Sequence, residues 1–115
     1  MPETITPAEL QACLANQSPC RIIDVRRRAD FEAEPVLVPG ALWRNPDDVD
    51  GWAKELPETT GEIVVYCARG GSVSKSVVAA LGGKNVSARY VEGGLAAWRN
   101  TGGAVEGAQI HGHSI

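Results

Sequence analysis

The sequence predicts an α/β domain built on a mostly parallel sheet with helices on both faces. Short β-branched runs alternate with segments that carry helix-capping signals, and this alternation is typical of strand–helix–strand units. The clearest runs, Arg21–Val25 and Glu62–Tyr66, are apolar enough for strands that are buried on both faces. At 115 residues and 12.2 kDa the chain has the size of one domain. We assign the domain to residues 1–105 and a flexible, Gly-rich C-terminal tail to residues 106–115.

Each element follows from local signals. The opening segment Thr6–Glu9 combines a capping hydroxyl, a proline at the first helical position and a glutamate at the third, which predicts a helix to about Ala15. Asn45–Asp48 repeats this pattern, and the helix that it starts should reach Leu56, because Pro57 stops it. The other segments are shorter and are bounded by turn residues. They predict strands over 21–25, 41–43, 62–66 and 88–91, and helices over 29–34, 73–81 and 95–100.

The composition argues against several classes of function. A net charge of -3 and a pI near 5.3 argue against nucleic acid as a partner, and the absence of any apolar stretch of about 18 residues argues against a membrane partner. The odd number of cysteines, Cys13, Cys20 and Cys67, and their unpaired spacing predict reduced thiols in a cytoplasmic protein. His111 and His113 lie in the predicted tail. We therefore expect no metal site, no other cofactor and no histidine-dependent chemistry.

The segment that follows strand 62–66 is the strongest candidate site. Ligands of parallel sheets bind outside the carboxyl ends of the strands, and Cys67 is the first residue beyond this strand. The Gly70–Gly71 pair allows a tight turn with positive φ, in which several amide N–H groups converge. The following helix N-terminus and Arg69 would stabilise a thiolate there. These neighbours favour an exposed, activated thiol over the alternative of a small apolar residue packed at a strand end.

Four segments, in this order and spacing, resemble the single-domain rhodanese family of sulfurtransferases. They are Ile23–Arg26, Val38–Ala41, Val64–Ser72 and Val91–Trp98. The resemblance extends from about Thr6 to Gly103. It implies that residues 1–105 form a rhodanese-like domain with a three-layer α/β fold and a five-stranded, mainly parallel sheet.

The resemblance also implies a persulfide mechanism. Cys67 would take sulfane sulfur from a small anionic donor such as thiosulfate and pass it to cyanide, a thiol or a protein acceptor. Arg69 would hold the donor's sulfonate, with Arg44 and Arg26–Arg28 as more distant candidates. Asp24 and Arg26 would form a hydrogen-bonded or ionic brace below the site. By position, the implied site residues are the catalytic Cys67, the loop and substrate-binding residues Ala68, Arg69, Gly70, Gly71, Ser72 and Val73, and the supporting pair Asp24 and Arg26.

The chain departs from the family pattern in two places, and two other functions remain open. Glu34–Val38 lacks a histidine that many members carry, and Gly71–Ser74 lacks an arginine that some members place there. Related phosphatases use an arginine six positions after the cysteine, where this chain has Val73, so a phosphatase or arsenate reductase is the less favoured alternative. The other alternative is a non-enzymatic binding module or a persulfide relay between proteins, because a relay needs the same loop.

The remaining conspicuous residues have structural interpretations. Trp52 and Trp98 recur with apolar neighbours at helical spacing, which predicts that they fill the core. Ser72 and Ser74 either donate hydrogen bonds into the loop or cap the helix that follows it.

Overall fold

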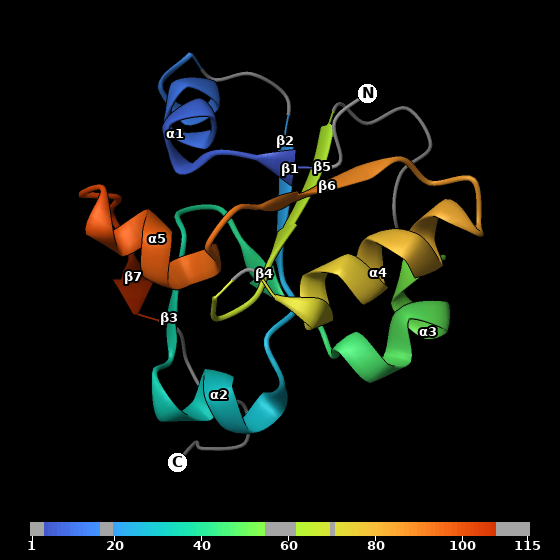
Figure 1. The fold of residues 1–115 in the computed structure, drawn as a ribbon. Coiled ribbons are helices and arrows are strands. Elements are labelled where there is room, and N and C mark those ends of the chain that lie inside the picture. Colours follow the sequence, from blue (N-terminus) through green and yellow to red (C-terminus); the bar gives the residue numbers. More distant parts are fainter. Residues whose placement is uncertain (1–3, 17–19, 55–61, 70, 108–115) are drawn as a thin grey trace.

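A five-stranded sheet lies at the centre of the computed structural model, which describes residues 4–16, 20–54, 62–69 and 71–107 (Figure 1). Its spatial order is β1-β6-β5-β2-β4, and every neighbouring pair is parallel. The predicted fold class is therefore confirmed. Because β5 is the middle strand, the residue that follows it lies at the centre of one sheet edge. The strands are β1 (Thr4–Ile5), β2 (Cys20–Asp24), β4 (Leu42–Trp43), β5 (Glu62–Tyr66) and β6 (Ala88–Val91).

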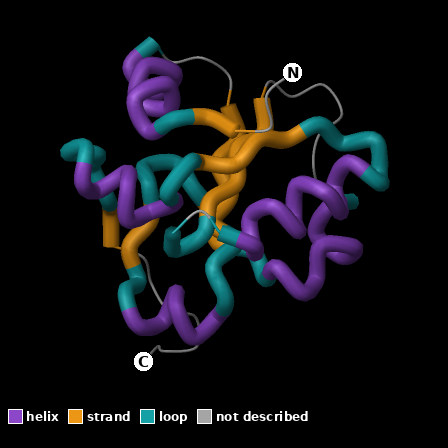
Figure 2. Tube along the Cα trace, in the orientation of Figure 1, coloured by secondary structure: helices purple, strands orange, loops and turns teal. Residues whose placement is uncertain are grey.

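Helices cover both faces of this sheet, and Figure 2 shows the strands running between two helical groups. One face carries α1 (Pro7–Ala15) and α5 (Gly94–Asn100), and the other carries α3 (Val49–Ala53) and α4 (Ser72–Gly82). The remaining helix, α2 (Arg28–Ala33), follows β2 in the chain. Within the described ranges, no helix is both long and apolar enough to cross a bilayer.

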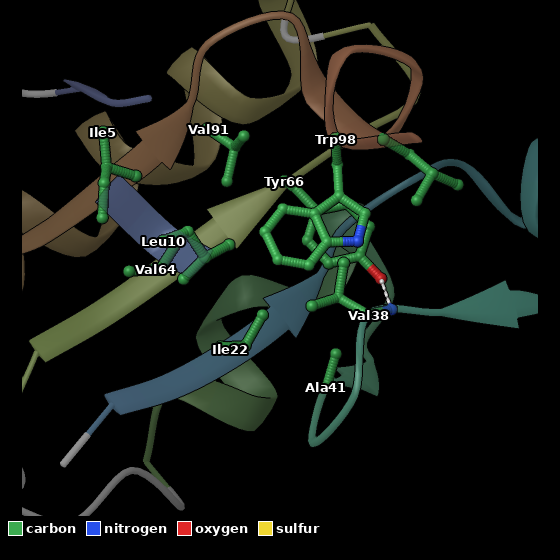
Figure 3. Packing of buried hydrophobic residues seen from close by; sticks show 10 residues of the cluster. Ile5, Leu10, Ile22, Val38, Ala41, Val64, Tyr66, Val91 and Trp98 are labelled. Carbon is green, nitrogen blue, oxygen red and sulfur yellow. Dashed lines mark hydrogen bonds between the residues drawn. The ribbon is translucent and has the colours of Figure 1, made fainter. Parts of the chain in front are cut away.

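The alternation of side chains along the strands divides the core into two clusters. The first cluster lies under α1 and α5 and contains Tyr66 and Trp98 (Figure 3). The second lies under α3 and α4 and contains Val65 and Trp52. Trp98 and Trp52 are only 2% and 5% exposed, so their assignment to the core is confirmed.

The N-terminal helix begins as its sequence predicts. Thr6 Oγ1 accepts a hydrogen bond from Glu9 N at 3.1 Å, and Glu9 Oε1 accepts one from Thr6 N at 2.9 Å. The reciprocal bonds satisfy two N–H groups that have no acceptor within the helix. The hydrogen bond from the Thr6 main chain lowers the pKa of the Glu9 carboxyl.

The segment after Asn45 differs from its predicted form. The Asn45 side chain accepts from Asp47 N, but the first turn is a 3-10 helix over Pro46–Asp48, and α3 begins only at Val49. Proline and the Asn45 cap favour a turn, and the tight 3-10 form is common at a helix N-terminus. α3 ends at Ala53, with Lys54 as its C-cap, so the predicted helix is too long at this end. Leu56 and Pro57 themselves lie outside the described residues.

Three short strands were not predicted. β1 is too short to show a period, yet Ile5 is fully buried beside β6. β3 (Val36–Leu37) pairs antiparallel with β7 (Glu106–Gly107) in a separate two-stranded sheet. The prediction of a flexible tail from residue 106 was therefore wrong for Glu106 and Gly107. These two residues form a strand because the extended segment after Pro35 pairs with them. The rest of the predicted tail, with His111 and His113, lies outside the described residues.

A close contact at the start of α5 makes Gly93 a specific requirement. Gly93 has φ +75°, and a Cβ added there would stand 2.4 Å from the Cβ of Ala97. Gly102, at the other end of α5, has φ +85°, but an added Cβ would meet nothing within 4 Å.

Gly93→Ala should therefore destabilise the protein by about 2 kcal/mol more than Gly102→Ala. Both variants carry the left-handed backbone penalty of about 1 kcal/mol, but only the first adds a clash. Urea unfolding of both variants measures the difference. Equal losses would show that the Ala97 contact relaxes without cost.

Candidate active site

Cys67 lies at the middle of the sheet edge formed by the carboxyl ends of the parallel strands. Cys67 directly follows β5. The residue before it, Tyr66, is joined to the chain that follows β2, because Val25 N donates to Tyr66 O at 2.8 Å. The Cys67 side chain is only 5% exposed and packs in the second cluster. The prediction of an exposed thiol was therefore wrong. Strand alternation explains the burial, because Val65 and Cys67 point to the same face, which α3 and α4 cover.

The start of α5 anchors the first part of the Cys67 loop. Leu95 N donates to Cys67 O at 2.9 Å, and Ala96 N donates to Ala68 O at 3.0 Å. N–H groups in the first turn of a helix have no acceptor within that helix, so the loop satisfies them. The turn before α5 is tight, since Gly93 and Gly94 both have positive φ. Sequence reasoning missed this anchoring role, although a Gly pair just before a helix is a signal for it.

The second part of the loop leads into α4. Gly71 is the N-cap of α4 and has φ -96°, so the predicted positive φ was wrong for Gly71, and Gly70 lies outside the described residues. No side chain caps the helix, and Ser72, its first residue, is exposed. The first-turn N–H groups, beginning with those of Ser72 and Val73, have no acceptor within α4. Such unsatisfied N–H groups at the start of a helix favour the binding of an anion.

Ser74 takes neither of its predicted roles. Its side chain is fully buried on the face of α4 that carries Val77 and Leu81. Within the described part of the chain, Ser74 Oγ has no hydrogen-bond partner. A buried hydroxyl without a partner costs about 1–3 kcal/mol, and we find no compensating contact for it.

Arg69 is the cation of the loop. Its side chain is exposed, and it forms no ion pair with the residues that the structure describes. Two of the more distant arginines that could hold the sulfonate of a donor already form ion pairs, because Arg26 pairs with Asp24 and Arg28 pairs with Glu32.

Asp24 and Arg26 form a buried ion pair, which confirms that the two side chains interact as predicted. Arg26 Nη2 donates to Asp24 Oδ2 at 2.7 Å, Arg26 Nε donates to both carboxylate oxygens, and Arg26 N donates to Asp24 Oδ1 at 2.9 Å. The side chains are 0% and 2% exposed. The desolvation cost of a buried ion pair is offset only if the remaining polar atoms of both side chains also form hydrogen bonds.

The remaining donors of Arg26 hold the segment that follows α2. Nη1 donates to Glu34 O at 2.9 Å, and Nη2 donates to Val36 O at 2.7 Å. The guanidinium also lies 5.2 Å from the ring centre of Phe31, which stacks on Trp43. Asp24 is in register with Tyr66, on the sheet face of the first cluster. The ion pair therefore braces the sheet edge from the face opposite the Cys67 thiol.

Tyr66, which directly precedes Cys67, extends this brace. Its hydroxyl oxygen accepts a hydrogen bond from Val38 N at 3.1 Å (Figure 3). Burial, together with the negative charge of Asp24, raises the pKa of Tyr66 well above its ordinary value of 10.0. The phenol therefore stays neutral and fixes the turn at 38–41 against β5.

A comparison with protein-family models assigns the chain to a family. The model described as Rhodanese-like domain matches residues 6–101. The chain belongs to the rhodanese-like family. The four sequence segments that suggested this family lie within the matched region, so that prediction is confirmed. Among curated proteins, no relative matches the chain significantly.

Solved structures share the rhodanese-like fold. A rhodanese-like domain protein from Staphylococcus aureus has 29% identity and a TM-score of 0.73, with coverage of 84% of this chain and 90% of that one. A protein from Lactobacillus plantarum has 23% identity and a TM-score of 0.82, with coverage of 91% and 88%. A thiosulfate sulfurtransferase from Pseudomonas aeruginosa has 23% identity and a TM-score of 0.77, and the match covers 94% of this chain but 20% of that one.

Arg26→Met should destabilise the rhodanese-like domain by about 3–5 kcal/mol, because it leaves the Asp24 carboxylate buried without a counter-charge. Arg28→Met is the matched control. It removes an exposed i,i+4 pair with Glu32, whose loss should cost about 0.5 kcal/mol or less. Urea midpoints of both variants test the contrast, and similar small losses would show that the buried pair does not brace the fold.

Tyr66→Phe should change how stability depends on alkaline pH. The raised pKa of Tyr66 gives a contribution that is complete below pH 10.0 and is lost as the pH rises further, because only the unfolded phenol ionises. Near pH 9 the variant should be less stable than the wild type by about 1–2 kcal/mol, since Val38 N loses its acceptor. Near pH 11 this gap should narrow by about 1 kcal/mol. Urea unfolding at both pH values measures it, and a constant gap would contradict the assignment.

Proposed function

We propose that this rhodanese-like domain is a sulfurtransferase that carries sulfane sulfur on Cys67. The observation that supports the proposal is the position of Cys67 between the carboxyl end of the central strand β5 and the uncapped start of α4. In a parallel sheet this is where ligands bind. The donor is a small anion such as thiosulfate, and the acceptor is cyanide or a thiol.

The transfer has two displacement steps. In the first, the Cys67 thiolate attacks the outer sulfur of thiosulfate, a new S–S bond forms, and the S–S bond of the donor breaks as sulfite leaves with its electron pair. In the second, the acceptor attacks the outer sulfur of the persulfide. With cyanide this releases thiocyanate and restores the Cys67 thiolate. Neither step needs an oxidant, a metal or a histidine base.

The groups near Cys67 that the structure describes can stabilise the negative charge of the donor and of the persulfide during these steps. The first-turn N–H groups of α4 are preorganised donors for a persulfide anion. Arg69 is exposed and supplies the cation for the sulfonate of the donor. The 5% exposure of Cys67 favours a small donor over a bulky one. The persulfide carries its outer sulfur about 2.05 Å beyond Sγ, which brings the reactive atom nearer to an acceptor.

The cysteine content favours a reducing compartment. Cys13 and Cys67 are free thiols in the structure, and the sequence has an odd number of cysteines. We therefore place this activity in the cytoplasm, where thiols stay reduced.

Intact-protein mass spectrometry after incubation with thiosulfate tests the proposal. Wild type should gain one sulfur atom, and cyanide should remove it as thiocyanate appears. Cys67→Ser should gain none. The control is the Cys13→Ser/Cys20→Ser double variant, which keeps Cys67 as the sole thiol and should retain sulfur transfer.

Other outcomes would favour the alternatives. A loaded Cys67 that cyanide never discharges, but that a partner protein does, would identify a persulfide relay. Turnover of a chromogenic phosphate ester, with no adduct from thiosulfate, would overturn the proposal in favour of a phosphatase.

A further inference from the structure

A small hollow lies on the α3 side of the sheet, outside the Cys67 loop. Its volume is about 80 Å³, and its walls include Arg21 and Ile23 of β2, Leu42 and Arg44 at β4, and Trp52 of α3. Small-molecule sites usually measure about 300–1,000 Å³. The hollow is therefore the size of one side chain.

The strand register explains why these residues meet. Ile23 pairs with Leu42 across the β2–β4 ladder, so both side chains point to the same face. Arg21 and Arg44 lie two positions from this pair along their own chain segments, which places them on that face too. β4 is the outermost strand of the sheet, so among the described residues no further strand pairs with it beside the hollow.

The two arginines form no ion pair with the residues that the structure describes. Arg21 and Arg44 differ in this from four other arginines, which do form ion pairs. Arg44 Nη1 donates to Trp43 O at 3.0 Å, which restrains the half-buried guanidinium beside the hollow. This local positive charge stands out in a chain of net charge -3.

Apolar side chains line the hollow together with the two arginines. Leu42 is 49% exposed and is the large hydrophobic side chain most accessible to solvent among the described residues. Trp52 is 5% exposed, and its Nε1 donates to Asn45 O, so its polar atom is already satisfied. An occupant gains from burying apolar surface here and from placing carboxylates near the two guanidinium groups.

We infer that this hollow is a docking site for one apolar side chain of an acidic protein segment, with carboxylates on either side of that side chain paired to Arg21 and Arg44. The inference goes beyond sulfur transfer and does not depend on it, because none of the described residues 67–69 and 71–73 lines the hollow.

Nuclear magnetic resonance of the isotope-labelled full chain tests the inference through its three indole N–H signals. The probe is a blocked pentapeptide with one leucine between two pairs of glutamates. The Trp52 signal should shift and saturate with a dissociation constant of about 1 mM, as a contact of this size allows. The Trp98 signal should not move, because Trp98 lies in the first cluster.

Three variants of the protein, one of them a control, and two further peptides separate the contributions. Leu42→Ser and Arg21→Gln should each weaken binding about fivefold, whereas Arg27→Gln, which changes an exposed arginine outside the hollow, should not. The same peptide with alanine in place of leucine should bind at least about fivefold more weakly. A peptide with lysine in place of glutamate should not bind.

Three results would overturn the inference. They are no shift at Trp52, equal shifts from the leucine and alanine peptides, and an equal shift from sodium sulfate, which would indicate a simple anion site. Cys67→Ser should bind the peptide as the wild type does. A failed docking test therefore leaves the sulfur-transfer proposal intact, and a failed sulfur-transfer test leaves the docking inference intact.

Discussion

The buried ion pair between Asp24 and Arg26 is the constraint on which the edge of the sheet depends. All three nitrogens of the Arg26 guanidinium, which is 2% exposed, donate hydrogen bonds, and their acceptors are the Asp24 carboxylate and the main-chain oxygens of Glu34 and Val36. These bonds fix the path of the chain after α2 and hold β3 in place. Trp43 Nε1 donates to Arg26 O, so β4 is held by the same residue. One buried residue thus holds the segment after α2, β3 and β4, the first two through its side chain and β4 through its main chain.

The two faces of the sheet carry different groups at the carboxyl end of β5. The face under α1 and α5 carries the ion pair and the Tyr66 hydroxyl, which bonds the carboxyl end of β5 to Val38. The opposite face carries the Cys67 side chain among apolar residues of α4. The strong charge of the brace is therefore kept away from the thiol. The main chain of β5 joins the two, because Tyr66 and Cys67 are consecutive and point in opposite directions.

The sequence predicted those elements whose signals are local. The capping box at Thr6–Glu9 and the β-branched run at 62–66 are visible within a few residues, and both elements form as expected. β1 and β7 could not be predicted, because two-residue strands have no period and depend on distant partners. The burial of Cys67 was missed for a related reason: the Gly pair and Arg69 indicated an exposed loop, whereas strand alternation turns the side chain into the core. The Asp24–Arg26 pair was predicted only because its spacing is a known motif.

The pairing of β1 with β6 sets an order for folding. Ile5 is fully buried, yet its neighbour across the ladder is Val91, so 86 residue positions separate the two. Contacts between distant segments form late, because closing a long loop costs entropy before any contact forms. During synthesis, β1 must wait unpaired until β6 has left the ribosome, and the edge of β5 that pairs with β6 stays unpaired for the same time. The chain therefore completes its sheet after translation of β6 rather than strand by strand.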